Sequence, residues 1–505
     1  MRKAWVRVSL LALAISAPAV AVAADYARTL AYEQTVAGIT AMVVAGGSAH
    51  DLQAAAAPLG LTLASSRREA PALPQLTEAH VSLVAIDLVL SQLALQAGAN
   101  YHVALRQAQS RPEVLLLDAG VTSLAALYEA VTAAGLTGVL DKTDDGYVLH
   151  VPLAVWNDAT LSLQPGETLL IDRSTGAFVV AAGTLAGTDA AIRATGAENP
   201  RLRDFNPFVV VALSGSAQFD RMRFSDLGYG IFAPLTGVTL VEGGFYRKGT
   251  PSHISNSIFD DVGSLALVDA ENATVDGNVF QNSSGPAVLI SGGKSLAMSG
   301  NVILAGPTAH GIKVTAGARD VQIIDNIVVG AGLNGIFADS GASDLMISNN
   351  LISGSHRSGV SIASADCISV GRNLLLKNVQ SGLAVRDSAG LQVVGNRLID
   401  NGNAGISVTH QPDYGVIAIA SNELDGNQVG IKGSTTARLS FAANDFSGQA
   451  PRLLDGELVQ FTDKFLNLKG LGAPTVIDGL DLKSTPKLTP SGALRPTSCS
   501  FPGDA

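Results

Sequence analysis

One short phrase, written nine times, divides residues 256–444 into segments of 22 to 26 residues. Each copy has an asparagine with an apolar residue one or two positions later. The asparagines are Asn256, Asn278, Asn301, Asn326, Asn350, Asn373, Asn396, Asn422 and Asn444. A glycine that begins a run of mostly alternating apolar residues lies seven to ten residues behind eight of them. The glycines are Gly263, Gly285, Gly311, Gly335, Gly359, Gly382, Gly405 and Gly430.

A period this short cannot contain a helical hairpin, and its richness in Val, Ile, Asn and Gly favours short strands joined by tight turns. Each period fits one coil of a parallel β-solenoid, in which coils stack at the spacing of strands in a sheet. Asparagine suits such turns because it tolerates left-handed backbone and its amide can bond to the neighbouring coil. The sequence therefore predicts an all-β chain built around a parallel β-helix.

Composition agrees with this architecture. Of the 505 residues 47% are apolar, and only 5% are aromatic and 15% charged. Such an aliphatic, glycine-rich chain suits a core of stacked coils. The formal charge is −10 and no run of basic residues occurs, which argues against nucleic acid as a partner.

The first 24 residues have the pattern of a secretory signal peptide. Arg2, Lys3 and Arg7 form its basic end, residues 8–15 its apolar core and residues 21–23 a small-residue cleavage site. The apolar run is too short to span a membrane, and no other segment approaches a transmembrane helix. We expect an exported, soluble protein. Without the leader, 30 basic residues face 43 acidic ones, a charge of −13.

Two cysteines, Cys367 in a coil and Cys499 near the end of the chain, lie far apart in sequence. A disulfide between them is conceivable, but scaffolds that depend on disulfides use more cysteines. The sequence favours two unpaired thiols.

The remaining chain divides into three parts. Residues 25–150 are expected to form a small α/β lead-in and cap. Within it 112–120 reads as a buried strand, and 121–135 as a helix capped by Thr122 or Ser123 that covers the open N-terminal end of the solenoid. Residues 151–450 form the β-helix, beginning with irregular coils. In residues 451–505 the period is lost, and we expect a C-terminal cap over 451–470 followed by an extended tail.

Alternating residues of a strand point outward, so the same position in successive coils builds a stripe on the surface. The expected outward residues two after each glycine are Leu265, Ala287, Lys313, Phe337, Ser361, Ala384, Ser407 and Lys432. Those four after each glycine are Leu267, Leu289, Thr315, Asp339, Ala363, Arg386, Thr409 and Ser434. The stripe is apolar or small in the first two coils and polar in the later ones. For the first two coils, a reversed phase that places these residues in the core stays open.

The polar part of the stripe carries the candidate site. Lys313, Asp339 and Arg386 lie on it, with His310 just before its glycine and His410 at the end of its strand. A single surface His or Lys is more often a solvated side chain than a functional one, so the argument rests on the clustering of these residues on one face.

Removing a proton beside a carboxylate requires a base and a neutralising cation, and an inversion also needs an acid on the other face of the sugar. His310 is the candidate base, Lys313 or Arg386 the cation, and Asp339 or Tyr414 the further partner. No metal-ligand cluster, phosphate-binding loop or serine-hydrolase elbow stands out, so we expect neither metal nor cofactor.

Several stretches, in order, resemble the periplasmic mannuronan C5-epimerases of bacterial alginate biosynthesis. They are LPQLT at 73–77, PEVLLLDAGVTSLAALYEAV at 112–131, YVLHVPLAVWNDATLSL at 147–163, GAFVVAAG at 176–183, DFNPFVVVALSG at 204–215 and HGIKV at 310–314. The resemblance covers most of residues 70–445. It implies a right-handed parallel β-helix in the periplasm that converts mannuronate to guluronate within the polymer.

One part of the family pattern is missing. The family's Asp-Pro-His-Asp motif would match residues 285–291, which read GPAVLIS here. His310 matches a family histidine that precedes the glycine of the next coil. The family arginine of that coil has no counterpart, because TAGA occupies 315–318.

Three functions are therefore compatible with the sequence. The resemblance favours an epimerase that acts on an acidic exopolysaccharide. The missing motif favours a catalytically inactive β-helix that binds or guides a polysaccharide together with other envelope proteins of an export complex. A polysaccharide lyase shares the fold and the proton abstraction, but no lyase signature is seen. Because the net charge repels a polyanion, binding requires a local basic patch such as Lys313 with Arg386.

Overall fold

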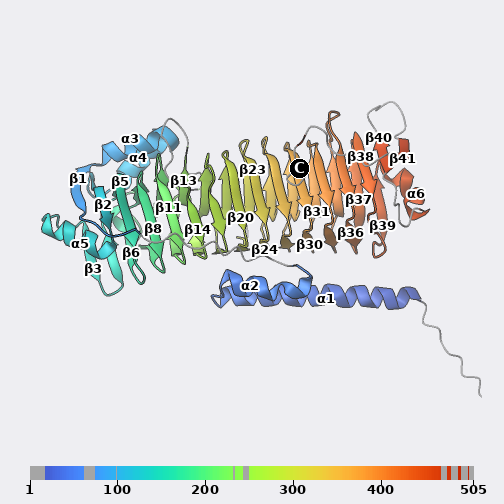
Figure 1. Cartoon of the computed structure of the whole chain (residues 1–505), viewed down its shortest axis with the longest axis horizontal. Helices are drawn as coiled ribbons and strands as arrows, with labels where there is room; N and C mark the ends of the chain where they lie inside the picture. The colour runs from blue at the N-terminus through green and yellow to red at the C-terminus, as the bar shows by residue number, and fades with distance from the viewer. Residues whose placement is uncertain are drawn as a thin grey trace, which may run out of the picture.

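A computed structural model of the chain describes residues 17–61, 74–97, 99–230, 234–242, 250–306, 308–467, 475–478, 487–490 and 499. Its body is a right-handed parallel β-solenoid whose coils follow one another along the long axis of the molecule (Figure 1). The predicted fold class is confirmed. Residues 1–16 of the predicted signal peptide lie outside the described residues.

Each regular coil contributes three short strands, which stack into three parallel faces. Face 1 contains β7 (Val179–Ala181), β10 (Val209–Ala212), β13 (Gly237–Val241), β16 (Ser264–Val268), β19 (Val288–Ser291), β22 (Ile312–Thr315), β25 (Ile336–Ala338), β28 (Val360–Ala363), β31 (Ser381–Arg386), β34 (Ala404–Thr409), β37 (Val429–Ser434) and β39 (Arg452–Gly456). Face 2 contains β8 (Thr184–Thr188), β11 (Ser216–Asp220), β14 (His253–Ser255), β17 (Thr274–Asp276), β20 (Lys294–Ser299), β23 (Arg319–Ile324), β26 (Ser343–Ser348), β29 (Asp366–Gly371), β32 (Leu391–Val394), β35 (Ile417–Ala420) and β38 (Arg438–Ala442). The long strand β5 (Leu153–Leu163) contributes to both faces, pairing with β7 and with β8.

Face 3 is a separate sheet. It contains β3 (Leu140–Thr143), β4 (Gly146–Leu149), β6 (Thr168–Asp172), β9 (Ala191–Thr195), β12 (Arg223–Leu227), β15 (Ile258–Val262), β18 (Val279–Gln281), β21 (Val302–Leu304), β24 (Ile327–Val329), β27 (Leu351–Ser353), β30 (Leu374–Leu376), β33 (Arg397–Ile399) and β36 (Glu423–Asp425). A short 3-10 turn, η2 (Arg173–Thr175), follows β6.

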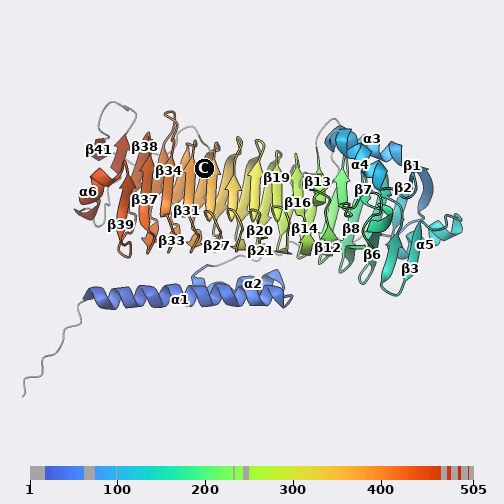
Figure 2. The same cartoon turned by 180° about the vertical axis from the view of Figure 1, so that it is seen from behind.

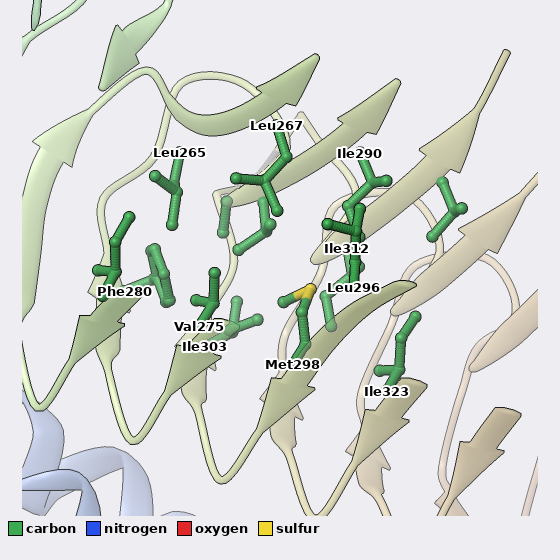
Figure 3. Close-up of a cluster of buried hydrophobic side chains, with 14 of the residues drawn as sticks. Leu265, Leu267, Val275, Phe280, Ile290, Leu296, Met298, Ile303, Ile312 and Ile323 are labelled. Atoms are coloured by element: carbon green, nitrogen blue, oxygen red, sulfur yellow. The ribbon is translucent and has the colours of Figure 1, made fainter. Parts of the chain in front are cut away.

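Inward side chains of the three faces fill the solenoid with aliphatic residues and a stack of phenylalanines. Rings of Phe224, Phe259 and Phe280 from three successive coils are stacked, with centroids 4.9 and 4.7 Å apart. Figure 3 shows the inward residues of neighbouring coils meeting in the same interior. Because coils repeat the same inward positions, each residue packs on its counterpart in the next coil.

In the first regular coil the predicted outward residues Leu265 and Leu267 prove to be inward and fully buried, so the reversed phase is correct there. In the second coil Leu289 is outward as predicted, whereas Ala287 is buried just before β19 begins. The pairing of Leu265 with Val288, and of Val288 with Ile312, puts Ser264 and Ala287 where Gly311 stands in the third coil. The glycines of those two coils therefore come one and two residues earlier than in later coils. The offset of one residue at Gly263 reverses the phase, whereas the offset of two at Gly285 keeps it.

The repeated asparagines form a continuous buried ladder between faces 2 and 3. From Asn278 to Asn444, each side-chain amide donates to the Oδ1 of the next asparagine at 2.9–3.0 Å. Each backbone N–H donates to the same oxygen at 2.9–3.1 Å. Buried amides need such partners, and here each coil supplies them to its neighbour.

Two details of the asparagine prediction need correction. Asn256 is not in the ladder, because Ser257 occupies its place and its N–H donates to Asn278. The left-handed conformation belongs to the residue before each ladder asparagine, such as Asn349 with φ 54° or Arg372 with φ 55°. The ladder asparagine itself is selected for its amide bonds to the neighbouring coil.

A second, shorter ladder lies between faces 3 and 1. Asn378, Asn401, Asn427 and Gln449 donate in sequence to one another at 2.8–3.0 Å. This ladder was not predicted from the sequence, because the repeat of these residues begins only in the later coils.

We predict that Asn350→Ala destabilises the solenoid by about 3 kcal/mol. The substitution leaves the backbone N–H of Asn326 and the carbonyl of Ile323 without their bonds to the Asn350 side chain. Chemical denaturation should show the loss. Asn403→Ala is the control, since the Asn403 amide makes one long bond of 3.3 Å to Ser381. Equal stability of the two variants would contradict the structural role of the ladder.

The N-terminal end of the core is covered by α5 (Leu124–Ala133). Ser123 is its N-cap, accepting from the N–H of Ala126 at 3.1 Å, as predicted. Leu124, Leu127 and Val131 join the solenoid core. The preceding strand β2 (Glu113–Thr122) pairs with β5 on one side and antiparallel with β1 (His80–Ala85) on the other.

Two more helices, α3 (Ile86–Ala97) and α4 (Ala99–Ala108), lie over face 1 at its N-terminal end (Figure 1). Ile86, Leu90 and Leu105 pack with outward residues of the first face-1 strands, among them Val180 and Val210. This part of face 1 is therefore interior, and its outward positions are apolar.

The first part of the chain takes a different course from the predicted lead-in. The helix α1 (Ala17–Val44), the helix α2 (Ala49–Ala55) and the 3-10 turn η1 (Ala57–Leu59) run along face 3 (Figures 1 and 2). We call these residues, 17–59, the N-terminal strap. Tyr32, Val36, Ile39 and Val43 lie on one side of α1 and are buried.

The surface beneath the strap is an apolar stripe on face 3. Its buried members are Val279, Val302, Ile327, Leu351, Leu374, Leu376 and Ile399. The strand after each ladder asparagine thus carries apolar residues both inward and outward. A strand covered on both sides has this pattern, since alternation is lost when both faces are buried.

Polar contacts fix the strap at both ends. Arg28 pairs with Glu423 at 2.7 Å and with Asp425 at 2.5 Å, and Lys377 pairs with Glu33. Arg397 donates to the carbonyl of Leu59 at 2.7 Å. Figures 1 and 2 show α1 running antiparallel to the direction in which the coils advance, from the late coils that Arg28 contacts toward earlier ones, and Gln53 of α2 donates to the carbonyl of Gly300.

We predict that Ile39→Asp releases the strap while the solenoid stays folded. A carboxylate in this apolar contact would be buried without a partner, which costs several kcal/mol. Trypsin should then cleave near Arg28, with the main thermal transition retained. Leu30→Asp is the control, because Leu30 is already 41% exposed. Unchanged resistance of the Ile39 variant to trypsin would contradict this account.

At the C-terminal end the solenoid closes with η3 (Val459–Phe461) and α6 (Thr462–Asn467), which bring Leu458 and Phe461 into the core. Part of the expected extended tail is ordered strand. The strand β40 (Thr475–Asp478) pairs antiparallel with β38 and with β41 (Lys487–Pro490), because Val476 and Ile477 become buried there.

The expectation of two unpaired thiols is wrong. Cys367 and Cys499 form a disulfide across 132 residues of sequence. Cys499 lies beside the beginning of β29, where Cys367 stands. The separation of the two cysteines in sequence does not predict that they are close in the fold.

No described helix combines the length and the apolar character that crossing a membrane requires.

Candidate functional site

The register of face 1 aligns its outward residues into two columns. Column A contains Leu289, Lys313, Phe337, Ser361, Ala384, Ser407, Lys432 and Asp455. Column B contains Ser291, Thr315, Asp339, Ala363, Arg386, Thr409 and Ser434, where Asp339 directly follows β25. From β22 onward these are the predicted stripes. Neighbours in a column are about 4.8 Å apart.

Four side chains of β22, β25 and the turn before β22 form one group, which we call the His310 cluster: His310, Lys313, Phe337 and Asp339. Lys313 Nζ lies 3.9 Å from Asp339 Oδ2 and 5.8 Å from the centre of the Phe337 ring. The His310 ring is stacked on Phe337, with centroids 4.7 Å apart and 14° between the planes. The imidazole and the cation thus share one aromatic neighbour, and the acid pairs with the cation.

His310 is held in its neutral form. Burial, followed by the nearby positive charges of Lys313 and Arg357, lowers the pKa of His310 to about 4. The backbone N–H of Asn334 donates to Nδ1 at 3.3 Å. Since Nδ1 accepts, the proton of the neutral ring is on Nε2, which is then a hydrogen-bond donor.

Asp339 is held from one side only. Its Oδ2 faces Lys313, whereas Oδ1 is buried and has no hydrogen-bond partner among the residues that the structure describes. A buried carboxylate oxygen without a donor is unfavourable, so a hydroxyl or amide of a ligand would be bound there with a gain in free energy.

We predict that the His310 imidazole does not titrate between pH 5.5 and 8. Its pKa of about 4 leaves the folded protein with fewer bound protons than the unfolded chain, in which the pKa is near 6.5. The contribution of His310 to stability is therefore complete above pH 6.5 and is lost as the pH falls toward 4. NMR of the C2 protons tests this, and a midpoint for His310 near 6.5 would contradict it.

The structure brings three of the five predicted site residues together and leaves two apart. Arg386 stands in column B two coils beyond Asp339, about 10 Å away, and its Nε lies 3.6 Å from Asp387. His410 is exposed in the turn after β34, a further coil away.

Tyr414, the alternative acid, donates to Asp366 at 2.8 Å, a bond that raises the pKa of Tyr414. Asp366 belongs to face 2.

Sequence reasoning missed three contributors to the cluster. Phe337 was predicted to be outward, but its stacking on His310 was not. The backbone N–H of Asn334 donates to His310, and the positive charge of Arg357 helps to lower the pKa of His310. An outward phenylalanine in a chain with few aromatic residues was the one available signal.

Outside the His310 cluster, the described part of the chain provides weaker evidence for a functional site. No three His, Cys, Asp or Glu side chains there gather as metal ligands would. A cavity of about 920 Å³ lies at the C-terminal end of the solenoid, lined by Phe441, Phe446, Phe465 and Arg452 among others. It is remote from the His310 cluster and contains none of its residues.

Comparisons with known proteins support the fold. A family model described as right handed beta helix region matches residues 208–352 and, in a second overlapping match, 308–446. No protein of curated function matches the sequence.

Among solved structures, a periplasmic alginate epimerase, AlgG, is similar with a TM-score of 0.62 and 15% identity. The similarity covers 78% of this chain and 94% of that one. The A-module of the Azotobacter vinelandii mannuronan C-5 epimerase AlgE4 aligns over 67% of this chain and 96% of its own, with 16% identity and a TM-score of 0.40. At such identities the likeness to AlgG concerns the fold alone.

Proposed function

We propose that the protein acts on an acidic exopolysaccharide bound along face 1, as a C5-epimerase of the mannuronan type. The observation that carries the proposal is the His310 cluster, which places a neutral imidazole, a cation and a carboxylate on the strip of outward residues. The likeness to AlgG in fold and the sequence resemblance to its family support the choice of reaction.

An extended polymer would lie along columns A and B, crossing successive coils. Lys313, with Arg357 nearby, would neutralise the sugar carboxylate, which makes the C5 proton easier to remove. Breaking the C5–H bond leaves its electron pair in the enolate of that carboxylate. The proton goes to His310, whose Nε2 can accept it only when the ring proton is on Nδ1 and the bond from Asn334 is released. Inversion is complete when C5 receives a proton on its other face. The candidate donor is Asp339, which would have to be protonated to supply it.

One observation favours a second function, a catalytically inactive polysaccharide-binding protein. In the tautomer that Asn334 selects, Nε2 of His310 carries a proton and cannot accept another. His310 and Lys313 would then both donate to sugar oxygens. The absent family motif at 285–291 also fits this function, as would a role beside other envelope proteins of an export complex.

We place the protein in the periplasm, with residues 1–24 removed as a signal peptide. The described polar contacts of the strap begin at Arg28, so cleavage after residue 24 would leave them in place. The α1 helix would lose its first eight residues, 17–24, and keep its buried side.

Proton NMR of polymannuronate incubated with the mature protein distinguishes the functions. New guluronate signals would support the epimerase. Unsaturated chain ends would instead identify a lyase. An unchanged polymer that still binds in a titration would establish the inactive binding protein.

If the protein is an epimerase, we predict that His310→Ala abolishes guluronate formation, by at least about 10²-fold, with the fold intact by circular dichroism. His410→Ala, outside the cluster, is the matched control and should retain activity. Full activity of the His310 variant would refute the assignment of His310 as the base.

A further inference from the structure

Column A continues toward the N-terminus beyond Leu289, but there it is covered. The pairing of face 1 extends the column through Ala266, Thr239, Val210, Val180 and Ala154. All five are at most 6% exposed. Leu289 is the first partly exposed residue of the column.

The cover over the first strands of face 1 is a folded layer. Helices α3 and α4 bury Val89, Leu90 and Leu105 against Val180 and Val210. A helix with its side chains is about 10 Å across, so the layer stands about that high above the strands (Figure 1). A polymer lying in the columns cannot continue through it.

The open part of face 1 is therefore shorter on the N-terminal side of the His310 cluster than on its C-terminal side. Toward the N-terminus, Lys313 is two coil steps, about 10 Å, from buried Ala266. Toward the C-terminus, column A continues from Lys313 to Asp455 over six steps, about 29 Å. Lys432, whose Nζ lies 3.7 Å from Asp455, is a cation in this longer arm.

We infer that face 1 is closed at its N-terminal end and that the protein holds an acidic polysaccharide by one end of its chain. This inference rests on the proposed binding of such a polymer along face 1. The sugar at the His310 cluster is then at or next to a chain terminus, and the rest of the polymer extends over β28 to β39. The protein works at the end of a strand and does not slide along its middle.

The test uses mannuronate oligomers long enough to span the open coils. Three forms are titrated against the full mature protein: unlabelled, with a bulky fluorophore at the reducing end, and with the same fluorophore at the non-reducing end. We expect one labelled form to bind at least about tenfold more weakly than the unlabelled oligomer, and the other to bind equally well. The weakened form identifies the enclosed end.

Two variants test whether the oligomers bind on face 1. Lys313→Ala should weaken all three forms. Lys294→Ala is the control, because Lys294 lies on β20 of face 2 and pairs with Glu271 at 3.4 Å. It should leave binding unchanged.

The two ways of failing differ. If both labelled forms bind as well as the unlabelled oligomer, the polymer passes beyond the helices and the closed end is refuted, while binding along face 1 stands. If no form binds, the proposed function itself is refuted, and with it this inference.

Discussion

The buried asparagine ladder is the interaction on which the other features depend. An amide enclosed by apolar coils must find hydrogen-bond partners, and here both its donor and its acceptor are satisfied only when adjacent coils are in one register. A shift by one residue would leave donors unpaired in every coil. With the register fixed at one corner, the outward residues of face 1 align. Lys313 therefore stands beside Phe337 and one coil from Asp339.

The His310 cluster shows how a negatively charged protein can present a local site for an anion. Lys313 in the cluster and Arg357 nearby supply positive charge beside a histidine that burial keeps neutral. Lys313 is bound only loosely, at 3.9 Å from Asp339, and its side chain is 30% exposed. A carboxylate of a ligand can compete for such a cation, because a half-exposed ion pair at this distance contributes little.

Sequence periodicity was sufficient for the later coils, because each has its glycine one residue before the first inward residue, as Gly311 precedes Ile312. It failed at Gly263, where one intervening residue reverses the phase. After Gly285, where two residues intervene, it placed Leu289 correctly but not Ala287, and only strand pairing reveals these offsets. His310, Lys313 and Asp339 were predicted to share a face because they obey the regular count. Their stacking on Phe337 and the tautomer of His310 depend on side-chain and backbone positions that no spacing encodes. Strands that are apolar on both sides, such as Leu374–Leu376, indicate that face 3 is covered. The pattern does not indicate which segment of the chain covers it.

A solenoid is nearly one-dimensional, since each coil touches only the coils before and after it, and such arrays can open locally. The strap changes this connectivity. The strap packs on coils from Val279 to Ile399 at once, so separating any two of them also requires bending or detaching the strap. The covered coils behave as one cooperative block, and the ends of the solenoid outside the strap are where unfolding can begin. Face 1 of the same coils carries the His310 cluster, which therefore lies on the stiffest stretch of the molecule.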